Sequence, residues 1–144
     1  MKTMIRILLA GGALALGFAS GSVPAEVVVI VNPANSIASL DVETARRIYL
    51  GKDKTFPNGQ PATPGDQPEG SRTRTEFYRK VVAKSEAQVK AYWAQLIFTG
   101  KDTPPEVIGG DAAMRRWVAR RKDAIGYIDG DAVDDSVKVV ARIP

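Results

Sequence analysis

The sequence predicts a single α/β domain, and three observations support this prediction. Runs of β-branched residues alternate along the chain with segments whose apolar residues recur at helical spacing. The length of 144 residues, with 44% apolar and 25% charged residues, suits one globular domain. The sequence contains no internal repeat and no low-complexity tract. The predicted order is strand, helix, strand, three helices and two strands, which favours a layered α/β architecture.

The N-terminal segment, residues 1–25, differs from the rest in composition. It has a basic start, an apolar run without charge over residues 7–19, and small residues up to Ala25. This pattern is typical of a secretory signal peptide. We therefore expect cleavage near Ala25, with residues 26–144 forming one periplasmic or secreted domain. The alternative is an uncleaved anchor, although the apolar run is shorter than the about 20 residues of a membrane-spanning helix.

The first half of the predicted domain contains a strand and a helix. Residues 26–31 are β-branched without alternation, which is typical of a strand buried on both faces. Asp41 is a preferred N-cap and Gly51 a helix stop, so we expect a helix between them. Residues 52–64 are rich in turn residues and indicate a surface connection or an edge hairpin. The expected core face of this helix consists of Val42, Ala45, Ile48 and Tyr49.

The middle of the chain predicts a short strand and two helices. The strand falls within residues 60–67, and apolar spacing predicts a helix over residues 71–84. Ser85 and Gln88 form a capping-box pattern that starts the next helix, which Gly100 ends. Its expected apolar face consists of Val89, Tyr92, Trp93, Leu96 and Ile97.

The C-terminal part predicts one helix and two strands. Asp111 is expected to cap the helix, and residues 107–108 before it are expected to pair briefly with a strand. Residues 125–128 and 137–143 are the strands, separated by an acidic loop. The expected inward residues of the helix are Met114, Trp117 and Val118.

The turn before residues 71–84 has the features of an anion site. Gly70 breaks regular structure, and Ser71 is a preferred N-cap. The first backbone N–H groups of a helix lack intrahelical partners and lie at the positive end of its dipole. Hydroxyl groups at Ser71 and Thr73 and guanidinium groups at Arg72 and Arg74 add donors for an anion. The alternative is an ordinary N-cap with a solvated basic first turn.

Composition excludes several kinds of chemistry. The chain has no cysteine and no histidine, so disulfides, thiolate catalysis, Ser-His-Asp triads and histidine-ligated metals are excluded. No pair of carboxylates is placed by the sequence in a plausible pocket, and we expect neither an enzyme nor a cofactor.

The net charge of the predicted domain is small. Without Lys2 and Arg6, the chain has 18 basic and 16 acidic residues, a net charge of +2. This mild balance argues against a nucleic-acid partner.

A cluster of basic residues lies at the end of the last predicted helix. We interpret it as a solvated face with cations at the favourable end of the helix dipole, and the alternative is a basic docking patch. The cluster consists of Arg115, Arg116, Arg120, Arg121 and Lys122.

Three stretches together resemble the periplasmic phosphate-binding proteins of ABC importers, which have the type II periplasmic-binding-protein fold. Residues 45–52 resemble the family's IYLGK helix end, and residues 69–74 resemble its phosphate-binding DGSGT loop. Residues 124–128 resemble its late AIGYV strand. The similarity covers most of residues 26–144. It implies a single lobe of this fold, with a mixed β-sheet flanked by about four helices.

The resemblance also implies which residues bind the anion. By position, Ser71, Arg72 and Thr73 would donate hydroxyl and backbone N–H bonds to phosphate oxygens, next to the flexible Gly70. Gln67 stands where the family commonly has an arginine, and Arg72 replaces the family's glycine. Our hypothesis is that the guanidinium has moved from the first of these positions to the second.

The implied function is that of an exported solute-binding-like protein that recognises phosphate or a similar oxyanion and is linked to ABC-type phosphate uptake. Family members close two lobes on the anion, whereas this chain has room for one. Burial would therefore be completed by a second copy, another lobe-containing protein or a transporter. The alternative is a protein-interaction or sensory module of the cell envelope that has lost anion binding.

Overall fold

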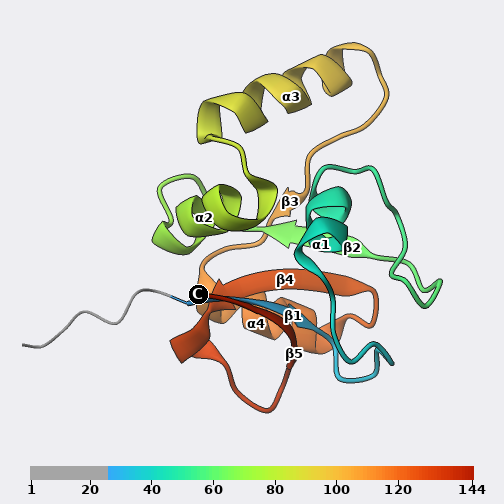
Figure 1. The fold of residues 1–144 in the computed structure, drawn as a ribbon, viewed down its shortest axis with the longest axis vertical. Helices are drawn as coiled ribbons and strands as arrows, with labels where there is room; N and C mark the ends of the chain where they lie inside the picture. The colour runs from blue at the N-terminus through green and yellow to red at the C-terminus, as the bar shows by residue number, and fades with distance from the viewer. Residues whose placement is uncertain (1–25) are drawn as a thin grey trace, which may run out of the picture.

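A five-stranded mixed sheet organises the fold. The computed structural model describes residues 26–144 (Figure 1). The strand order is β3-β2-β4-β1-β5; β1 is antiparallel to β4 and β5, and β2 is parallel to β3 and β4. The strands are β1 (Val27–Val31), β2 (Thr63–Asp66), β3 (Glu106–Val107), β4 (Ala124–Asp129) and β5 (Lys138–Ile143). The expected signal peptide lies outside the described residues and stays a prediction.

Residues 26–144 contain four α-helices, as predicted. They are α1 (Val42–Tyr49), α2 (Arg72–Phe77), α3 (Glu86–Phe98) and α4 (Asp111–Arg120). A π-helical turn, η1 (Tyr78–Val82), continues α2, and a 3-10 turn, η2 (Gly130–Ala132), lies between β4 and β5. None of the helices in this part of the chain has the length and apolar character that crossing a bilayer requires.

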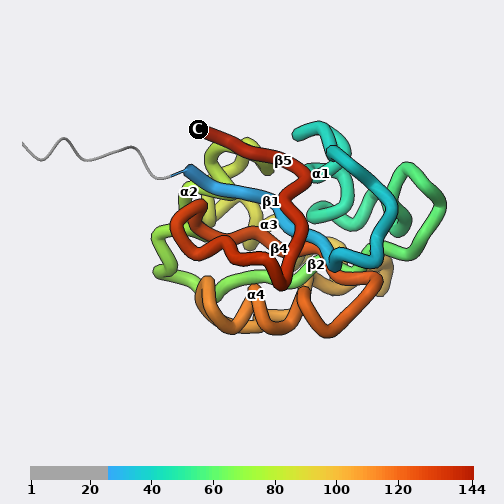
Figure 2. The backbone as a smooth tube through the Cα atoms, turned by 90° about the horizontal axis from the view of Figure 1, so that it is seen from below, coloured from blue at the N-terminus to red at the C-terminus, as the bar shows by residue number. Residues whose placement is uncertain are grey.

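The sheet has a hydrophobic core on each face. Figure 2 shows α4 along one side of the sheet, and α1 and η1 contribute to the core on the other side. Val28 and Ile30 of β1 face α4, and the alternate residues Val27, Val29 and Val31 face the larger core. All five residues of β1 are buried, so the prediction of a strand buried on both faces is confirmed.

Helix α1 begins and ends where the sequence predicted. The carboxylate of Asp41 accepts a hydrogen bond from the backbone of Thr44, and Gly51 adopts the left-handed conformation, with φ of 71°, just past the helix. The prediction that Val42 belongs to the core is wrong, because this residue is 37% exposed. It lies in the first turn, and the buried stripe of the helix starts only at Ala45.

The helix predicted over residues 71–84 is divided into two parts. Ser71 caps α2 as expected, but the hydrogen-bonding pattern changes to a π-helical turn after Phe77 and ends at Ala83, a left-handed residue with φ of 58°. A uniform α-helix presents a single apolar stripe. The expected apolar face of this segment, Phe77, Tyr78, Val81 and Val82, is nevertheless buried, as predicted.

Helix α3 stands away from the sheet at one end of the molecule (Figure 1). Its predicted capping box is present, with Ser85 and Gln88 exchanging hydrogen bonds. Trp93 is buried, and the Tyr92 hydroxyl donates to the Leu50 carbonyl at 2.6 Å. The prediction that Ile97 faces inward is wrong, because it is 53% exposed near the projecting end of the helix.

Helix α4 begins differently from the prediction. Its N-cap is Gly110, which has no capping side chain, and Asp111 is the first helical residue. The Asp111 carboxylate does not cap its own helix, because it accepts hydrogen bonds from Gln67, Thr73 and the backbone of Asp129. Met114 and Val118 are buried as predicted, and Trp117 is half-buried.

Candidate functional site

The predicted anion-binding residues lie where β2 leads into α2. We call this region the α2 corner and define it by Gln67, Gly70, Ser71, Arg72, Thr73 and Asp111. Gly70 has φ of 87°, a conformation that side-chain-bearing residues rarely adopt, and it turns the chain into the helix. The Ser71 hydroxyl then accepts a hydrogen bond from the Arg74 backbone at 3.2 Å. The predicted helix start is therefore confirmed.

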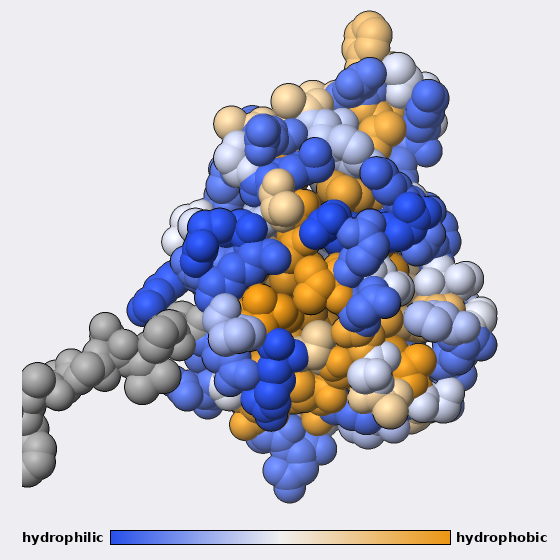
Figure 3. Space-filling model, in the orientation of Figure 1, coloured by the Kyte–Doolittle hydropathy of each residue, from blue (hydrophilic) through white to orange (hydrophobic). Residues whose placement is uncertain are grey.

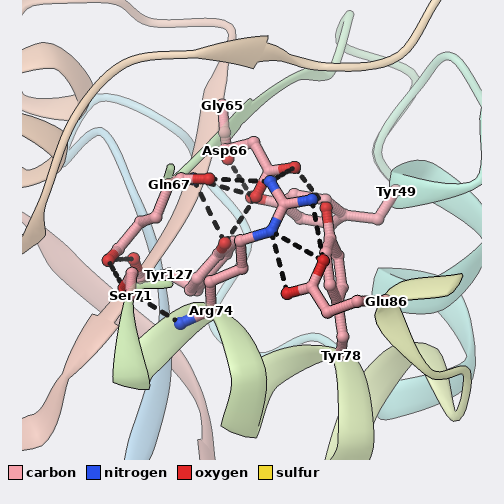
Figure 4. Close-up of polar contacts among 9 residues, drawn as sticks. All are labelled: Tyr49, Gly65, Asp66, Gln67, Ser71, Arg74, Tyr78, Glu86 and Tyr127. Atoms are coloured by element: carbon pink, nitrogen blue, oxygen red, sulfur yellow. Dashed lines mark hydrogen bonds and ion pairs between the residues drawn. The ribbon is translucent and has the colours of Figure 1, made fainter. Parts of the chain in front are cut away.

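Gln67 is buried beneath this corner and is fully engaged inside the fold (Figure 4). Its amide nitrogen donates to Asp111 Oδ1 at 2.8 Å and to the Tyr127 carbonyl at 3.1 Å. Its amide oxygen accepts from the Ser71 hydroxyl at 2.6 Å. Because an amide has only two N–H donors, Gln67 holds Ser71 and Asp111 in place and has no donor left for a ligand.

Asp111 places a carboxylate in the corner, which the sequence analysis did not foresee. Besides the bond from Gln67, it accepts from Thr73 Oγ1 at 3.3 Å and from the Asp129 backbone N–H at 3.2 Å. Its position in the first turn of α4 also favours a negative charge. The structure thus brings Gln67 and Thr73 together around this carboxylate, and Ser71 is linked to it through Gln67.

Three donors of the corner have no partner among the described residues. The backbone N–H groups of Arg72 and Thr73 open α2 and have no hydrogen-bond partner within residues 26–144. The Arg72 side chain is exposed and has no ion-pair or hydrogen-bond partner in the same residues. Gly70 is exposed as well and adds no side chain that would cover these groups.

Arg74 does not join these donors, and the expectation that its guanidinium meets the same anion is wrong. It is buried and donates to Asp66 Oδ2 at 3.0 Å and to the Gln67 carbonyl at 2.7 Å (Figure 4). It also forms an ion pair with Glu86 of α3 at 3.2 Å. Its charge is therefore neutralised inside the protein.

Asp66 is the centre of the buried network under the corner. Its carboxylate accepts from the hydroxyl groups of Tyr78 and Tyr127, from Arg74, and from the Gln67 backbone at 2.8 Å. Burial raises the pKa of Asp66, and these donors partly oppose the shift. Burial and the adjacent Asp66 charge raise the pKa of both tyrosines, which keeps them neutral as donors. This network fixes the turn from β2 to α2.

Two hollows lie close to the corner, and Gly70 is the only corner residue that lines either of them. A shallow one of about 420 Å³ is lined by Glu69, Gly70, Thr75, Glu86, Ala87 and Lys90. A groove of about 520 Å³ lies between α3 and residues 104–107 and is mainly apolar. Residues 26–144 contain no group of three or more side chains arranged to hold a metal ion.

No protein-family model matches the sequence, and no curated protein matches it. Solved structures do match. They include an ABC-type phosphate transport receptor from Vibrio cholerae, with a TM-score of 0.65 and 22% identity, over 81% of this chain and 45% of that chain. A putative phosphate ABC transporter substrate-binding protein with bound phosphate from Clostridium perfringens matches with a TM-score of 0.65 and 24% identity, over 81% of this chain and 44% of that chain. PstS from Borrelia burgdorferi matches with a TM-score of 0.61 and 10% identity, over 81% of this chain and 47% of that chain.

These matches establish the fold. The chain has the architecture of a single lobe of these periplasmic-binding-protein-like structures, as its sequence motifs implied. It spans less than half the length of each. The predicted fold class, an α/β lobe with a mixed sheet and four flanking helices, is confirmed.

Proposed function

We propose that this lobe is a non-enzymatic, exported binding protein that recognises phosphate or a similar oxyanion at the α2 corner. The observation that carries the proposal is the start of α2. There, two backbone N–H groups and the exposed Arg72 guanidinium have no partner within residues 26–144, on a fold shared with a structure that contains bound phosphate. Structures with this fold include transport receptors and substrate-binding proteins of phosphate ABC transporters. A role in ABC-type phosphate uptake follows for this chain as part of the proposal.

The donors divide into a contacting layer and a supporting layer. The backbone N–H groups of Arg72 and Thr73 and the Arg72 guanidinium contact the anion directly, because nothing in the described fold engages them. Gly70 lets the oxyanion approach the backbone closely. Gln67 lies beneath and orients Ser71 by accepting its hydroxyl hydrogen bond. When an oxyanion binds, it is a stronger acceptor than the Gln67 amide oxygen, and the Ser71 hydroxyl turns toward it.

Asp111 favours an anion that carries a proton. Its carboxylate lies 3.3 Å from Thr73 Oγ1, so an anion bound at the start of α2 lies close to a second negative charge. At about 4 Å, two like charges repel by roughly 4 kcal/mol at an effective dielectric constant of 20. The O–H group of hydrogen phosphate can donate a hydrogen bond to the carboxylate, whereas sulfate has no proton at neutral pH. We therefore expect phosphate to bind more tightly than sulfate.

One lobe leaves the anion exposed to water, so solitary binding is weak. In an open site, hydrogen bonds to the anion replace equally good bonds to water. We expect a Kd on the order of 1 mM, equivalent to about −4 kcal/mol. A second copy, another lobe-containing protein or a transporter would complete the burial and increase the affinity.

Titration calorimetry of the purified protein with phosphate and with sulfate tests this proposal. Arg72→Gln should weaken phosphate binding by about tenfold, because it removes one charge-assisted hydrogen bond. Arg79→Gln is a matched control, because Arg79 is exposed and pairs with Glu76 away from the corner. Absence of heat at ten times the expected Kd, or equal binding by the two variants, would remove the α2 corner as a site.

A second candidate function is that of an interaction module, and the surface of α3 favours it. Phe98 is 91% exposed, and Ile97 and Val107 are more than half exposed beside the apolar groove. Apolar side chains are visible on the surface between hydrophilic patches and at the projecting end of the molecule (Figure 3). This candidate predicts concentration-dependent self-association in ultracentrifugation, abolished by Phe98→Ser, together with no response to phosphate. A monomer at all concentrations would count against it.

Export is part of the proposal and has its own test. The composition of residues 1–25 motivates it, and the structures that match are transport receptors and substrate-binding proteins. N-terminal sequencing of the protein from the extracytoplasmic fraction should find a chain that begins near Glu26. A full-length chain confined to the cytoplasm would contradict export.

A further inference from the structure

The outer face of α4 carries a hollow whose rim is rich in arginine. It has a volume of about 420 Å³ and is lined mainly by residues of α4, the helix that lies on the opposite side of the sheet from α1 (Figure 2). We call it the α4 basic hollow. Its lining residues are Ile108, Ala113, Arg116, Trp117, Arg120 and Arg121.

Two cations on this rim are not compensated inside the protein. Arg116 and Arg120 are exposed, lie one helical turn apart, and have no acidic partner within residues 26–144. Arg120 uses only Nε, which donates to the Arg116 carbonyl at 3.1 Å, so its terminal nitrogens stay available. Like charges at this spacing destabilise a helix by a few tenths of a kcal/mol. An acidic partner would convert this repulsion into attraction.

Arg121, at the other end of the rim, is held in place. Its guanidinium forms two hydrogen bonds of 3.1 Å to Asp123, and it lies 5.3 Å from the centre of the Trp117 ring. Only this arginine of the hollow is neutralised by an acidic residue in the described part of the chain. The uncompensated charge is therefore concentrated at Arg116 and Arg120.

The floor of the hollow is apolar and firmly positioned. The Trp117 ring packs so closely on Gly65 of β2 that a Cβ atom there would lie 2.5 Å from it. Ile108 lines the same hollow, and Trp117 is half-buried, so part of the ring is open to a partner. Tryptophan and arginine are enriched among residues that dominate protein–protein binding.

We propose that the α4 basic hollow docks an acidic segment of a partner protein. Carboxylates of that segment pair with Arg116 and Arg120, and an apolar side chain between them rests on Trp117 and Ile108. Charge complementarity identifies the partner, because two exposed guanidinium groups one turn apart, without an acidic partner within residues 26–144, match a segment with several carboxylates. A lone oxyanion would leave the apolar floor unused, and a membrane surface would not fill a hollow.

The test measures the binding of a fluorescein-labelled peptide of alternating Glu and Leu by anisotropy. The double variant Arg116→Gln/Arg120→Gln should weaken binding at least about tenfold, the effect of two partly buried ion pairs. The control Lys52→Gln/Lys101→Gln removes the same charge from exposed lysines elsewhere and should bind normally. A peptide with Gln in place of Glu should not bind.

Three outcomes would overturn the proposal. The first is absence of peptide binding, or equal binding by the two double variants. The second is that only vesicles containing phosphatidylglycerol bind, in an Arg116-dependent manner, which would indicate a membrane surface. The third is that inorganic phosphate at constant ionic strength displaces the peptide completely, which would indicate a small-anion site. Arg72→Gln should leave peptide binding unchanged, so this test is independent of the α2 corner.

Discussion

Replacing Arg74 with Met tests whether the buried ion pair beneath the α2 corner holds three elements together. Arg74 is only 8% exposed and connects β2, through Asp66, with α3, through Glu86. Its bond to the Gln67 carbonyl also fixes the turn before α2. Methionine is unbranched and uncharged, so the substitution removes the charge while it keeps most of the packing.

The expected loss of unfolding free energy depends on the hydrogen-bond donors that Asp66 keeps after the substitution. Removing one partner of a buried ion pair typically costs about 3–5 kcal/mol, because the other charge is left without compensation. Asp66 keeps two tyrosine hydroxyls and one backbone N–H as donors, so we expect the lower end, about 3 kcal/mol. For a domain of this size, that loss lowers Tm by roughly 10–20 °C.

The assay is urea unfolding of the purified protein, followed by circular dichroism at neutral and at acidic pH. The loss of unfolding free energy should be smaller at acidic pH. Without Arg74, the buried Asp66 accepts a proton more readily, and the protonated carboxyl carries no uncompensated charge. Arg79→Met is the control, since Arg79 is exposed and should have little effect. A loss below about 1 kcal/mol at neutral pH, the range of surface pairs, would refute the reasoning.

Three further predictions address the corner and the sheet. Ser71→Ala should cost about 1 kcal/mol in urea unfolding through loss of the N-cap, as should the matched cap variant Ser85→Ala of α3. Gly126→Ala should cost about 1–3 kcal/mol in the same assay, because a Cβ atom would lie 2.8 Å from Met114 Sδ. Burial raises the folded-state pKa of Asp66 above its ordinary value of 3.8. Its contribution to stability is therefore full below that value and is lost as pH rises through the folded-state pKa. Asp66→Asn should remove this component from the pH dependence of the unfolding midpoint, and an unchanged pH profile would contradict the assignment.

The features that the sequence predicted well depend on neighbours along the chain. Ser85 and Gln88 exchange their capping bonds across three positions, and Ser71 caps Arg74 across three. Such patterns are complete within a short window, so the residue types alone indicate the structure. The starts of α2 and α3 could be predicted for this reason.

The features that sequence analysis missed depend on distant parts of the chain. Asp111 meets Gln67 across 44 positions and Thr73 across 38, and no local pattern indicates that these residues share one corner. The prediction that Asp111 caps α4 failed because tertiary donors compete successfully with the helix's own N–H groups for the carboxylate.

The two arginines of α2 show what limits affinity at the corner. Residues two apart on a helix point in nearly opposite directions, so Arg72 and Arg74 cannot both face one anion. Arg74 faces inward because Asp66 and Glu86 lie there, which leaves Arg72 as the only guanidinium at the outer surface of the corner in the described chain. With Asp111 adjacent, the fixed side-chain charges near a bound anion sum to about zero. Net attraction then depends on the backbone N–H groups and on whatever encloses the ligand, so tight binding by this lobe requires a second surface.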